Sequence, residues 1–315
     1  MMGSVSRLVG IDIGGSGLRL QTVLDGAAST VGTASGARIT PEGIDLDALV
    51  ASAKVLLETE AGDENLSPID VIAWSMRGLL GLSDPQSVLG AVVARLGAAR
   101  TVVCSDALSS LVGALGAVRP GAVVAAGTGA VAFGTDFAEV WRRVDGWGHV
   151  LGDRGSAAWV GLAGLRAALQ THDGVSTSGT ALLAAAVDHF GPPTDWPRAV
   201  MTRTDAPALL AGFAPVVTAL AQSDPAAADI AAAAGRALAA SLAAAAEDVT
   251  EAVVTATGGL LLAASVREAF ENACLERQLV LVPARGTSLD GALELARHLH
   301  SGRPLVARLP YLLLS

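Results

Sequence analysis

The sequence predicts an α/β protein built from two lobes. Its 315 residues are more than one hydrophobic core usually serves, so two lobes of roughly 100 to 200 residues each are expected. Apolar runs typical of strands alternate with helical patterns along the chain. Two similar glycine turns, in "IDIGGSG" and "AAGTGA", stand at corresponding places in successive parts of the chain, which indicates a duplicated lobe.

The first glycine turn lies in "LVGIDIGGSGLRLQTVLD", residues 8–25. Residues 18–25 alternate with a period near two, so this turn connects a strand to a strand. A dinucleotide fingerprint needs a helix at this point, which excludes that kind of site. The single lysine, Lys54, has no G-x-x-x-x-G-K-[ST] motif around it, which excludes a P-loop. The turn is then either a plain hairpin or a hairpin that cradles phosphate.

The remaining patterns extend the α/β order. They predict a buried strand over 101–104 and a helix after it, a second glycine hairpin over 121–136, a glycine-rich loop over 146–155 followed by a helix, a short helix near 181–189, one long helix in the alanine-rich stretch 225–249, and a strand, glycine turn and helix over 253–270. The "RPG" at 119–121 breaks the chain. We therefore expect an N-terminal lobe of residues 1–119 and a C-terminal lobe of residues 120–315, with an extreme C-terminus that can pack back on the first lobe.

Composition limits the partners and the location of the chain. The net charge is −9, aromatic residues make up 3% of the chain, and Lys and Arg form no run, so we expect no nucleic-acid partner. No run of about 18 strongly apolar residues and no secretory signal are visible, so we expect no membrane span. Cys104 and Cys274 lie far apart and form no C-x-x-C pair, which favours a reducing cytoplasm.

Asp12 is a carboxylate inside an apolar strand, where its charge is costly unless it is paired or metal-bound. It lies either at an exposed strand end or beside bound phosphates, where it would hold Mg²⁺ directly or through water. Gly14, Gly15 and Gly17 would let backbone N–H groups approach phosphate oxygens, and Ser16 would add a hydroxyl donor.

Asp106 stands between a predicted strand and a predicted helix. It is either an N-cap, a role that Ser105 could fill instead, or a general base. As a general base it would take the proton of a substrate hydroxyl during phosphoryl transfer. The local sequence leaves both alternatives open.

The loop over 146–155 holds two further candidates. Asp153 is either a solvated turn residue or a sugar ligand. Trp147 lies between two glycines, and an exposed indole beside a carboxylate can hold a sugar, because the ring packs on C–H faces while the carboxylate accepts from hydroxyls. The histidines, including His149, show no metal-ligand spacing and are expected to be structural.

The order of "IDIGGSG", "SDA", "AAGTGAVAFG", "GWGHVLGDRGS", "TATGGLL" and "PARGTSLDGALELA" resembles the N-acetylglucosamine kinase branch of the BadF/BadG/BcrA/BcrD ATPase family, in the actin, Hsp70 and sugar kinase superfamily. The resemblance extends over residues 8–297. It implies two ribonuclease H-like lobes, each with a five-stranded mixed sheet, and an interlobe cleft for ATP, Mg²⁺ and sugar. The implied activity is transfer of the γ-phosphate of ATP to the 6-hydroxyl of an amino sugar.

The same resemblance implies roles for individual residues. By matching position, Asp12 with Gly14, Gly15, Ser16 and Gly17 resembles the first phosphate motif, Gly127, Thr128 and Gly129 the second motif near the γ-phosphate and sugar, Gly258 and Gly259 the adenosine motif, Asp106 the catalytic base, and Trp147, Gly148, Asp153 and Ala157 sugar-contacting positions. Asp12 is then the carboxylate that positions Mg²⁺.

Three departures concern the sugar. Relatives usually carry Glu at the position of Arg154, often a hydroxyl residue at that of Ala130, and a sugar-contacting asparagine that "TASGARITPEG" lacks. N-acetylglucosamine is favoured, with glucosamine and N-acetylmuramic acid as alternatives. Two other classes stay open: a nucleotide or sugar sensor without turnover, and a dehydratase activator, whose iron–sulfur cluster needs converging thiolates. Such kinases are commonly dimers, so a homodimer is one option.

Overall fold

The computed structural model describes residues 6–14, 17–36, 39–40, 43–61 and 67–315, which form two compact units. Unit 1 comprises Met1–Pro120, Asp136–Glu139 and Ala284–Ser315, and unit 2 comprises Gly121–Thr135 and Val140–Pro283. The whole segment from Ala284 onward thus belongs to unit 1, which is more of the chain than the extreme C-terminus alone.

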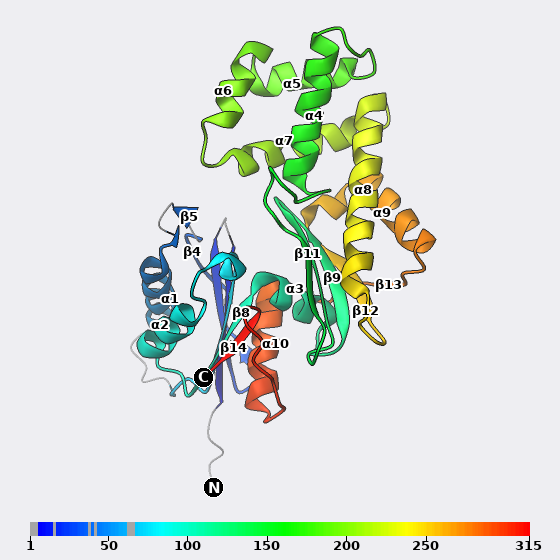
Figure 1. Cartoon of the computed structure of the whole chain (residues 1–315). Coiled ribbons are helices and arrows are strands. Elements are labelled where there is room, and N and C mark those ends of the chain that lie inside the picture. Colours follow the sequence, from blue (N-terminus) through cyan, green and yellow to red (C-terminus); the bar gives the residue numbers. More distant parts are fainter. Residues whose placement is uncertain (1–5, 15–16, 37–38, 41–42, 62–66) are drawn as a thin grey trace. The chain divides into compact units, whose positions relative to one another are not determined.

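The main sheet of unit 1 places three parallel strands side by side. Its strands are β1 (Arg7–Ile13), β2 (Leu18–Leu24), β3 (Ala27–Ala28), β4 (Gly32–Ala34), β7 (Val71–Met76), β8 (Arg100–Ser105) and β14 (Leu312–Leu314). They run in the order β14-β8-β7-β1-β2-β3, with β4 also paired to β2 (Figure 1). β1 and β2 form the predicted antiparallel hairpin, while β1, β7 and β8 are parallel. The carboxyl ends of these three strands therefore meet at one edge.

The five-stranded sheet that the resemblance implies is wrong for unit 1, whose main sheet has seven strands. β3 and β4 are short segments that pair with opposite ends of β2, so together they take one strand position. β14 adds another strand against β8, with Leu312 opposite Cys104. Two further short strands, β5 (Ile39–Thr40) and β6 (Gly43–Ile44), pair with each other in a separate two-stranded sheet.

Helices cover both faces of the unit 1 sheet (Figure 1). They are α1 (Leu46–Ala61), η1 (Leu79–Gly81), α2 (Gln86–Leu96), α3 (Asp106–Leu115) and α10 (Ser288–His300). Apolar side chains of α1 and α2 pack with Ile11, Ile72 and Trp74 in one core. α10 packs on α3 and on the other side of β1, where Gly10 leaves room for Leu293: a Cβ at Gly10 would lie 2.6 Å from the Leu293 Cγ.

The sheet of unit 2 has the five strands that the resemblance implies. They are β9 (Gly121–Ala126), β10 (Ala130–Thr135), β11 (Trp141–Asp145), β12 (Val253–Thr257) and β13 (Leu281–Val282), in the order β11-β10-β9-β12-β13. β9 and β10 are antiparallel and form the predicted second hairpin. β12 lies parallel to β9, so the turn after β9 and the turn after β12 come to the same edge of the sheet.

The helices of unit 2 are α4 (Ala157–His172), α5 (Thr180–Phe190), η2 (Pro193–Asp195), α6 (Trp196–Met201), α7 (Ala206–Leu220), α8 (Pro225–Ala246), η3 (Gly259–Leu262) and α9 (Ala264–Glu276). The alanine-rich stretch forms α8 as predicted. Its small side chains permit close packing on α9, where a Cβ at Gly235 would lie 2.5 Å from the Phe270 backbone nitrogen. One turn of 3-10 helix, η3, separates the predicted glycine turn from α9.

Helix α8 is long and apolar enough, by length and composition, to cross a membrane. Half of the window that gives this result is buried inside the protein, with Ala234, Leu238 and Leu242 in the core of unit 2. A core helix of a globular unit gives the same result, so α8 is only weak evidence for a membrane span.

Candidate active site

Asp12 lies on β1 and is 3% exposed, so it is not the exposed strand-end residue of one interpretation. Its Oδ2 forms an ion pair with the guanidinium of Arg19, which projects from the adjacent position on β2. Its Oδ1 accepts a hydrogen bond from the Ser75 hydroxyl at 3.4 Å. Pairing with Arg19 compensates the charge that would otherwise be costly in this buried position. Sequence reasoning missed Arg19, although it stands in the quoted stretch.

Two buried serines connect Asp12 to the start of α3. The sheet register aligns Asp12, Ser75 and Cys104 across β1, β7 and β8. The Ser75 and Ser109 hydroxyl oxygens are 2.7 Å apart, and the Ser109 hydroxyl oxygen lies 3.0 Å from the Asp106 carbonyl oxygen. Because each serine has one hydroxyl hydrogen, two of the three contacts Asp12–Ser75, Ser75–Ser109 and Ser109–Asp106 are hydrogen bonds at any one time. Asp12 and the first turn of α3 therefore belong to one hydrogen-bonded cluster within unit 1.

Asp106 is the first residue of α3, and Ser105 is the N-cap. The Ser105 hydroxyl oxygen accepts from the backbone N–H of Leu108 at 3.3 Å. Ser105, and not Asp106, therefore caps α3. The Asp106 Oδ1 accepts from the backbone N–H of Ala107 at 2.9 Å. This places the Asp106 carboxylate at the positive end of the α3 dipole.

Cys104 lies opposite Ser75 in the sheet and two residues before Asp106 in the chain. Its thiol is fully buried. Burial, followed by the negative charges of Asp12 and Asp106, raises its pKa well above the ordinary value. Burial also raises the pKa of Cys274 to about 11. Both thiols are therefore neutral near pH 7, and neither has the thiolate character of a nucleophile.

The first phosphate motif is described only in part. Gly14 and Gly17 are joined by a hydrogen bond of 2.9 Å from the Gly14 N–H to the Gly17 carbonyl oxygen. Gly15 and Ser16 lie outside the described residues, so their expected role as phosphate donors stays a prediction.

The second glycine turn is attached to the start of α4. The Gly127 N–H donates to the Gly129 carbonyl at 2.9 Å and closes the turn. The carbonyl oxygens of Gly127 and Thr128 accept from the N–H groups of Ala157 and Ala158, at 2.9 and 3.1 Å. The first turn of α4 thus holds the hairpin turn in a fixed position, and Ser156 caps that helix.

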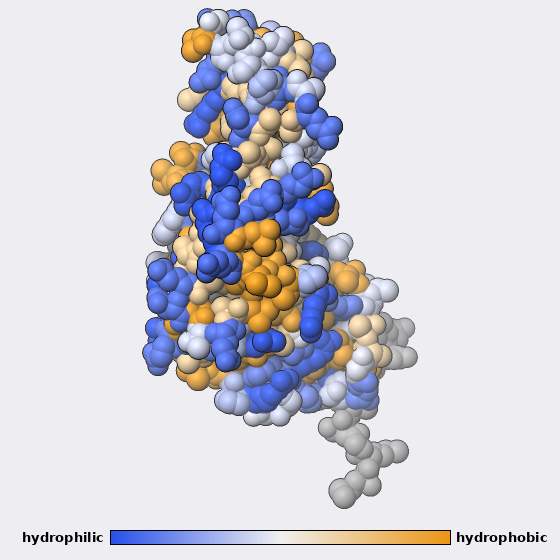
Figure 2. Space-filling model, turned by 90° about the vertical axis from the view of Figure 1, so that its right-hand side faces the viewer, coloured by the Kyte–Doolittle hydropathy of each residue, from blue (hydrophilic) through white to orange (hydrophobic). Residues whose placement is uncertain are grey.

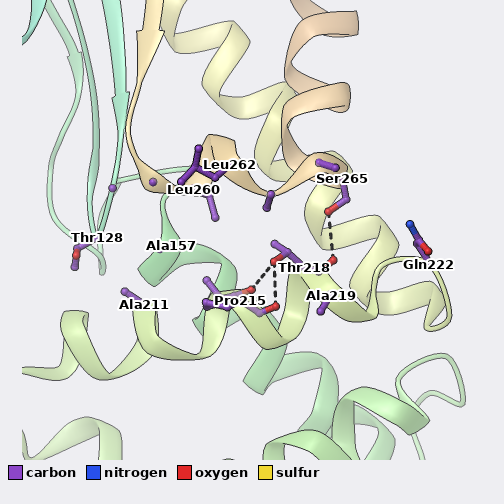
Figure 3. A pocket seen from close by; sticks show the side chains of 15 residues that line it. Thr128, Ala157, Ala211, Pro215, Thr218, Ala219, Gln222, Leu260, Leu262 and Ser265 are labelled. Atoms are coloured by element: carbon purple, nitrogen blue, oxygen red, sulfur yellow. Dashed lines mark hydrogen bonds between the residues drawn. The ribbon is translucent and has the colours of Figure 1, made fainter. Parts of the chain in front are cut away.

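A cavity of about 750 Å³ lies against this turn in unit 2 (Figure 3). It is lined by Gly127, Thr128, Ala157, Ala211, Ala214, Pro215, Thr218, Ala219, Gln222, Gly259, Leu260, Leu262, Ala263, Ala264 and Ser265. The lining is small and apolar with four hydrogen-bonding side chains and no ionisable one, which suits a purine and ribose better than a phosphate group. The helix α7 supplies one wall, and sequence reasoning missed it because α7 carries no motif.

The adenosine motif lies where β12 approaches the end of β9. Gly258 has a φ of 114°, and a Cβ there would clash with the Ala126 backbone. At Gly127 and Gly259, by contrast, nothing lies within 4 Å of the place a Cβ would take. Both of these glycines line the cavity, so backbone is open to a ligand there. The predicted second phosphate motif and the predicted adenosine motif therefore share one cavity.

The loop from Gly146 to Gly155 is organised by a carboxylate that sequence reasoning missed. Asp145, at the end of β11, is 5% exposed. Its Oδ1 accepts from the Asp153 N–H at 2.7 Å, and its Oδ2 accepts from the Arg154 N–H at 2.9 Å and from the Arg154 Nε at 3.3 Å. Its place directly before the glycine loop was the available sequence signal.

Asp153 and Trp147 occupy different environments in this loop. Asp153 is buried and its Oδ1 accepts from the Gly148 N–H at 3.1 Å, so it is not the solvated turn residue of one interpretation. Trp147 is 65% exposed, and the Arg143 guanidinium lies 4.4 Å from the centre of its ring. The indole is thus held by a cation–π contact while much of its surface stays open.

The residues near Asp12 fit a magnesium ion bound mainly through a nucleotide. Within the described part of the chain, His, Cys, Asp and Glu form no cluster of three that could hold a metal. Mg²⁺ typically uses one or two protein carboxylates and takes its other ligands from waters and phosphates. A buried carboxylate whose oxygens also meet Arg19 and Ser75 can supply one such ligand.

Comparison with known proteins gives matches over nearly the whole fold. A solved structure from Chromobacterium violaceum, provisionally named an N-acetylglucosamine kinase, has 27% identity and a TM-score of 0.72 over 93% of this chain and 99% of that one. A ROK family glucokinase from Streptomyces griseus, solved with glucose and AMPPNP, has 18% identity and a TM-score of 0.56 over 94% and 100% of the two chains. The second likeness shows the fold alone.

One curated relative matches over a shorter region. An N-acetylmuramic acid/N-acetylglucosamine kinase from Clostridium acetobutylicum is 32% identical over 92 residues, which are 29% of this chain and 30% of that protein. The match thus spans less than a third of the relative. The model of the BadF/BadG/BcrA/BcrD ATPase family matches residues 9–285, and the chain therefore belongs to this family.

Proposed function

We propose that this chain is an ATP-dependent kinase that phosphorylates the 6-hydroxyl of an amino sugar, with N-acetylglucosamine as the first candidate. The observation that carries the proposal is the cavity of unit 2, which joins the turn at Gly127 and Thr128 to Gly259 and to the start of α4. Membership of an ATPase family makes ATP the expected ligand of that cavity. The name of the Chromobacterium violaceum protein supports the sugar class.

In this proposal the nucleotide is bound chiefly by backbone. The adenosine would occupy the cavity beside Gly259, and the phosphates would meet backbone N–H groups of the two glycine turns other than those of Gly127 and Gly14, which close the turns themselves. Backbone N–H groups can approach phosphate closely at glycines because no side chain intervenes. When bound through Asp12, Mg²⁺ would spread the negative charge of the phosphates.

Asp106 is the proposed general base for the sugar hydroxyl. At the first residue of α3 it places a carboxylate, the group that would accept the proton, at the positive end of the helix dipole. In-line transfer needs the acceptor oxygen aligned with the γ-phosphorus and needs water excluded. Trp147, Gly148, Asp153 and Ala157, with Thr128 and Gly129, would provide that alignment by contacting the sugar.

N-acetylmuramic acid is the second candidate substrate. The relative from Clostridium acetobutylicum carries both sugars in its name, and it supports this candidate as well as the first. Glucosamine stays an alternative on sequence grounds. We also propose that the protein acts in the cytoplasm, which its two free, buried cysteines support.

A sugar panel with ATP and Mg²⁺ tests the proposal. N-acetylglucosamine, N-acetylmuramic acid, glucosamine and glucose are each incubated with the protein, and the product is identified by mass and by the position of its phosphate. We expect a 6-phosphate of one amino sugar. Asp106→Asn should lower kcat by a factor on the order of 100 to 10,000 with a smaller change in the sugar KM, because the base acts only in the transition state.

Other results would assign a different function. Sugar binding without any sugar phosphate would indicate a sensor, and ATP hydrolysis without sugar dependence, in an iron-containing protein, would indicate an activator. Full activity in Asp106→Asn would remove the role of Asp106. As a matched control, Asp84→Asn changes an exposed aspartate close to the start of another helix of unit 1, α2, and it should leave kcat within about twofold.

A further inference from the structure

The loop between β11 and α4 carries the proposed sugar contacts in a backbone conformation that needs support. Asp145, Gly146, Gly148, Asp153 and Gly155 all have positive φ angles, between 52° and 86°. Asp145 and Asp153 are the two among them that are not glycine, and a left-handed backbone is unfavourable for such residues. The surrounding contacts must therefore hold these two aspartates in place.

The Asp145 carboxylate supplies those contacts. By accepting from the N–H groups of Asp153 and Arg154, it ties the beginning of the loop to its end. Asp153 then ties the inner turn by accepting from Gly148 N–H, next to Trp147. Gly152 packs against the Asp145 carboxylate so closely that a Cβ would clash with its Oδ1. The two carboxylates thus fix the same loop from opposite sides.

Arg154 compensates the charge of this buried carboxylate. The Asp145 side chain is 2% exposed and the Arg154 side chain 62% exposed, so the guanidinium can remain hydrated while its Nε meets Asp145. A buried carboxylate without a counter-ion is unstable. A glutamate at position 154 would instead place a second negative charge beside Asp145 and Asp153. Arg154 is therefore the counter-ion of the buried Asp145 carboxylate.

We infer that Asp145 and Arg154 form a positioning pair for the sugar site, in which Asp145 sets the orientation of Asp153 and Trp147 and Arg154 supplies the counter-charge of the buried Asp145 carboxylate. This inference rests on the proposed sugar kinase function and adds to it two residues that do not touch the sugar. It gives Arg154 an internal partner, Asp145, within the loop. The pair acts on sugar binding, because the cavity proposed for adenosine is lined by other residues.

Steady-state kinetics of the full chain with both substrates varied test the pair. Asp145→Asn should raise the sugar KM by about tenfold or more, since a displaced binding group is costly, and should change the ATP KM by less than about twofold. Arg154→Glu should act in the same direction. Arg154→Lys keeps the charge and should lose much less sugar affinity than Arg154→Glu.

The double variant Asp145→Asn with Arg154→Glu separates a charge pair from two independent effects. If the residues are coupled, Arg154→Glu should raise the sugar KM less in the Asp145→Asn background than in the unsubstituted chain. The matched control is Arg203→Gln, which breaks an exposed ion pair with Asp205 in the same unit and should leave both KM values within about twofold.

Hydrogen exchange of residues 146–155 provides a readout independent of turnover. Asp145→Asn and Arg154→Glu should speed exchange in this loop, whereas Arg203→Gln should not. Since Arg154 is exposed, its variants keep the test valid if Asp145→Asn fails to fold. Sugar phosphorylation with unchanged sugar KM in Arg154→Glu, or equal shifts of both KM values, would overturn the pair. Failure of the proposed function is a distinct result, because the unsubstituted chain would then form no sugar phosphate.

Discussion

Asp12 and Asp145 are both buried carboxylates, and each has one arginine as counter-ion. Arg19 pairs with Asp12 across a hairpin, and Arg154 pairs with Asp145 across a loop. In each pair the arginine side chain is about half exposed, at 47% and 62%, while the carboxylate side chain is at most 4% exposed. Removing such an arginine leaves the charge of the carboxylate uncompensated in a buried place, which is more costly than loss of a surface ion pair.

Arg19→Gln tests this argument at the proposed metal site. The substitution should lower the free energy of unfolding by about 1 to 2 kcal/mol, between the values for exposed and buried pairs. Arg95→Gln breaks an ion pair with Asp47 in which both side chains are exposed, and it should cost less than about 0.5 kcal/mol. Denaturant unfolding measures both values. Adding Mg²⁺ with ADP should reduce the difference in free energy of unfolding between Arg19→Gln and the unsubstituted chain, and should leave the difference for Arg95→Gln unchanged. Equal losses of unfolding free energy in the two variants would contradict the argument.

At the scale of elements, the local patterns predicted both hairpins, because alternation and glycine turns are properties of neighbouring residues. Local patterns also predicted the strand that contains Cys104 and the helix after it. The partners of the site residues could not be predicted in this way. Ser75 meets Asp12 only through the parallel register of β7 on β1, and no feature of the sequence near either residue records that register.

Helix α7 shows a second limit of the sequence. It forms a wall of the cavity through Ala211, Ala214, Pro215 and Thr218, yet apart from the interior proline these are common residues of an apolar helix. The two glycine motifs of the same cavity could be recognised because glycines between apolar runs stand out in the sequence. A cavity that small side chains form by packing has no motif in the sequence, so it could not be predicted before the structure.

The small residues of α7 also allow a direct test of what the cavity binds. Ala211→Leu would extend a side chain into the cavity, and we expect the ATP KM to rise by about tenfold, equivalent to about 1.4 kcal/mol of binding free energy. The sugar KM should change by less than about twofold. Ala208→Leu, at an exposed position of the same helix, is the matched control. An increase confined to the sugar KM would place the sugar, and not adenosine, in this cavity.

At the scale of the whole molecule, unit 1 is completed by the last part of the chain. α10 packs against α3, β1 and β7, and β14 pairs with β8. The α3–α10 contact is close because glycines face backbone: a Cβ at Gly113 would clash with the Thr287 carbonyl, and one at Gly291 with the Ser109 carbonyl. Since Ser109 also bonds to Ser75, this crossing supports the cluster that connects Asp12 to α3.

Gly113→Ala should therefore disturb both stability and the proposed site. The methyl group meets backbone that cannot yield as a flexible side chain can, so we expect a loss of about 1 to 3 kcal/mol in the free energy of unfolding. Gly90→Ala, in the interior of α2 with nothing within 4 Å of the new methyl group, should instead be stabilising by about 0.5 to 1 kcal/mol. Because two units can unfold separately, hydrogen exchange should accompany denaturant unfolding. Faster exchange in α3 and α10 of Gly113→Ala, with unchanged exchange in β9 and β12, would locate the effect in unit 1, whereas uniform acceleration across both units would contradict a local role for this crossing.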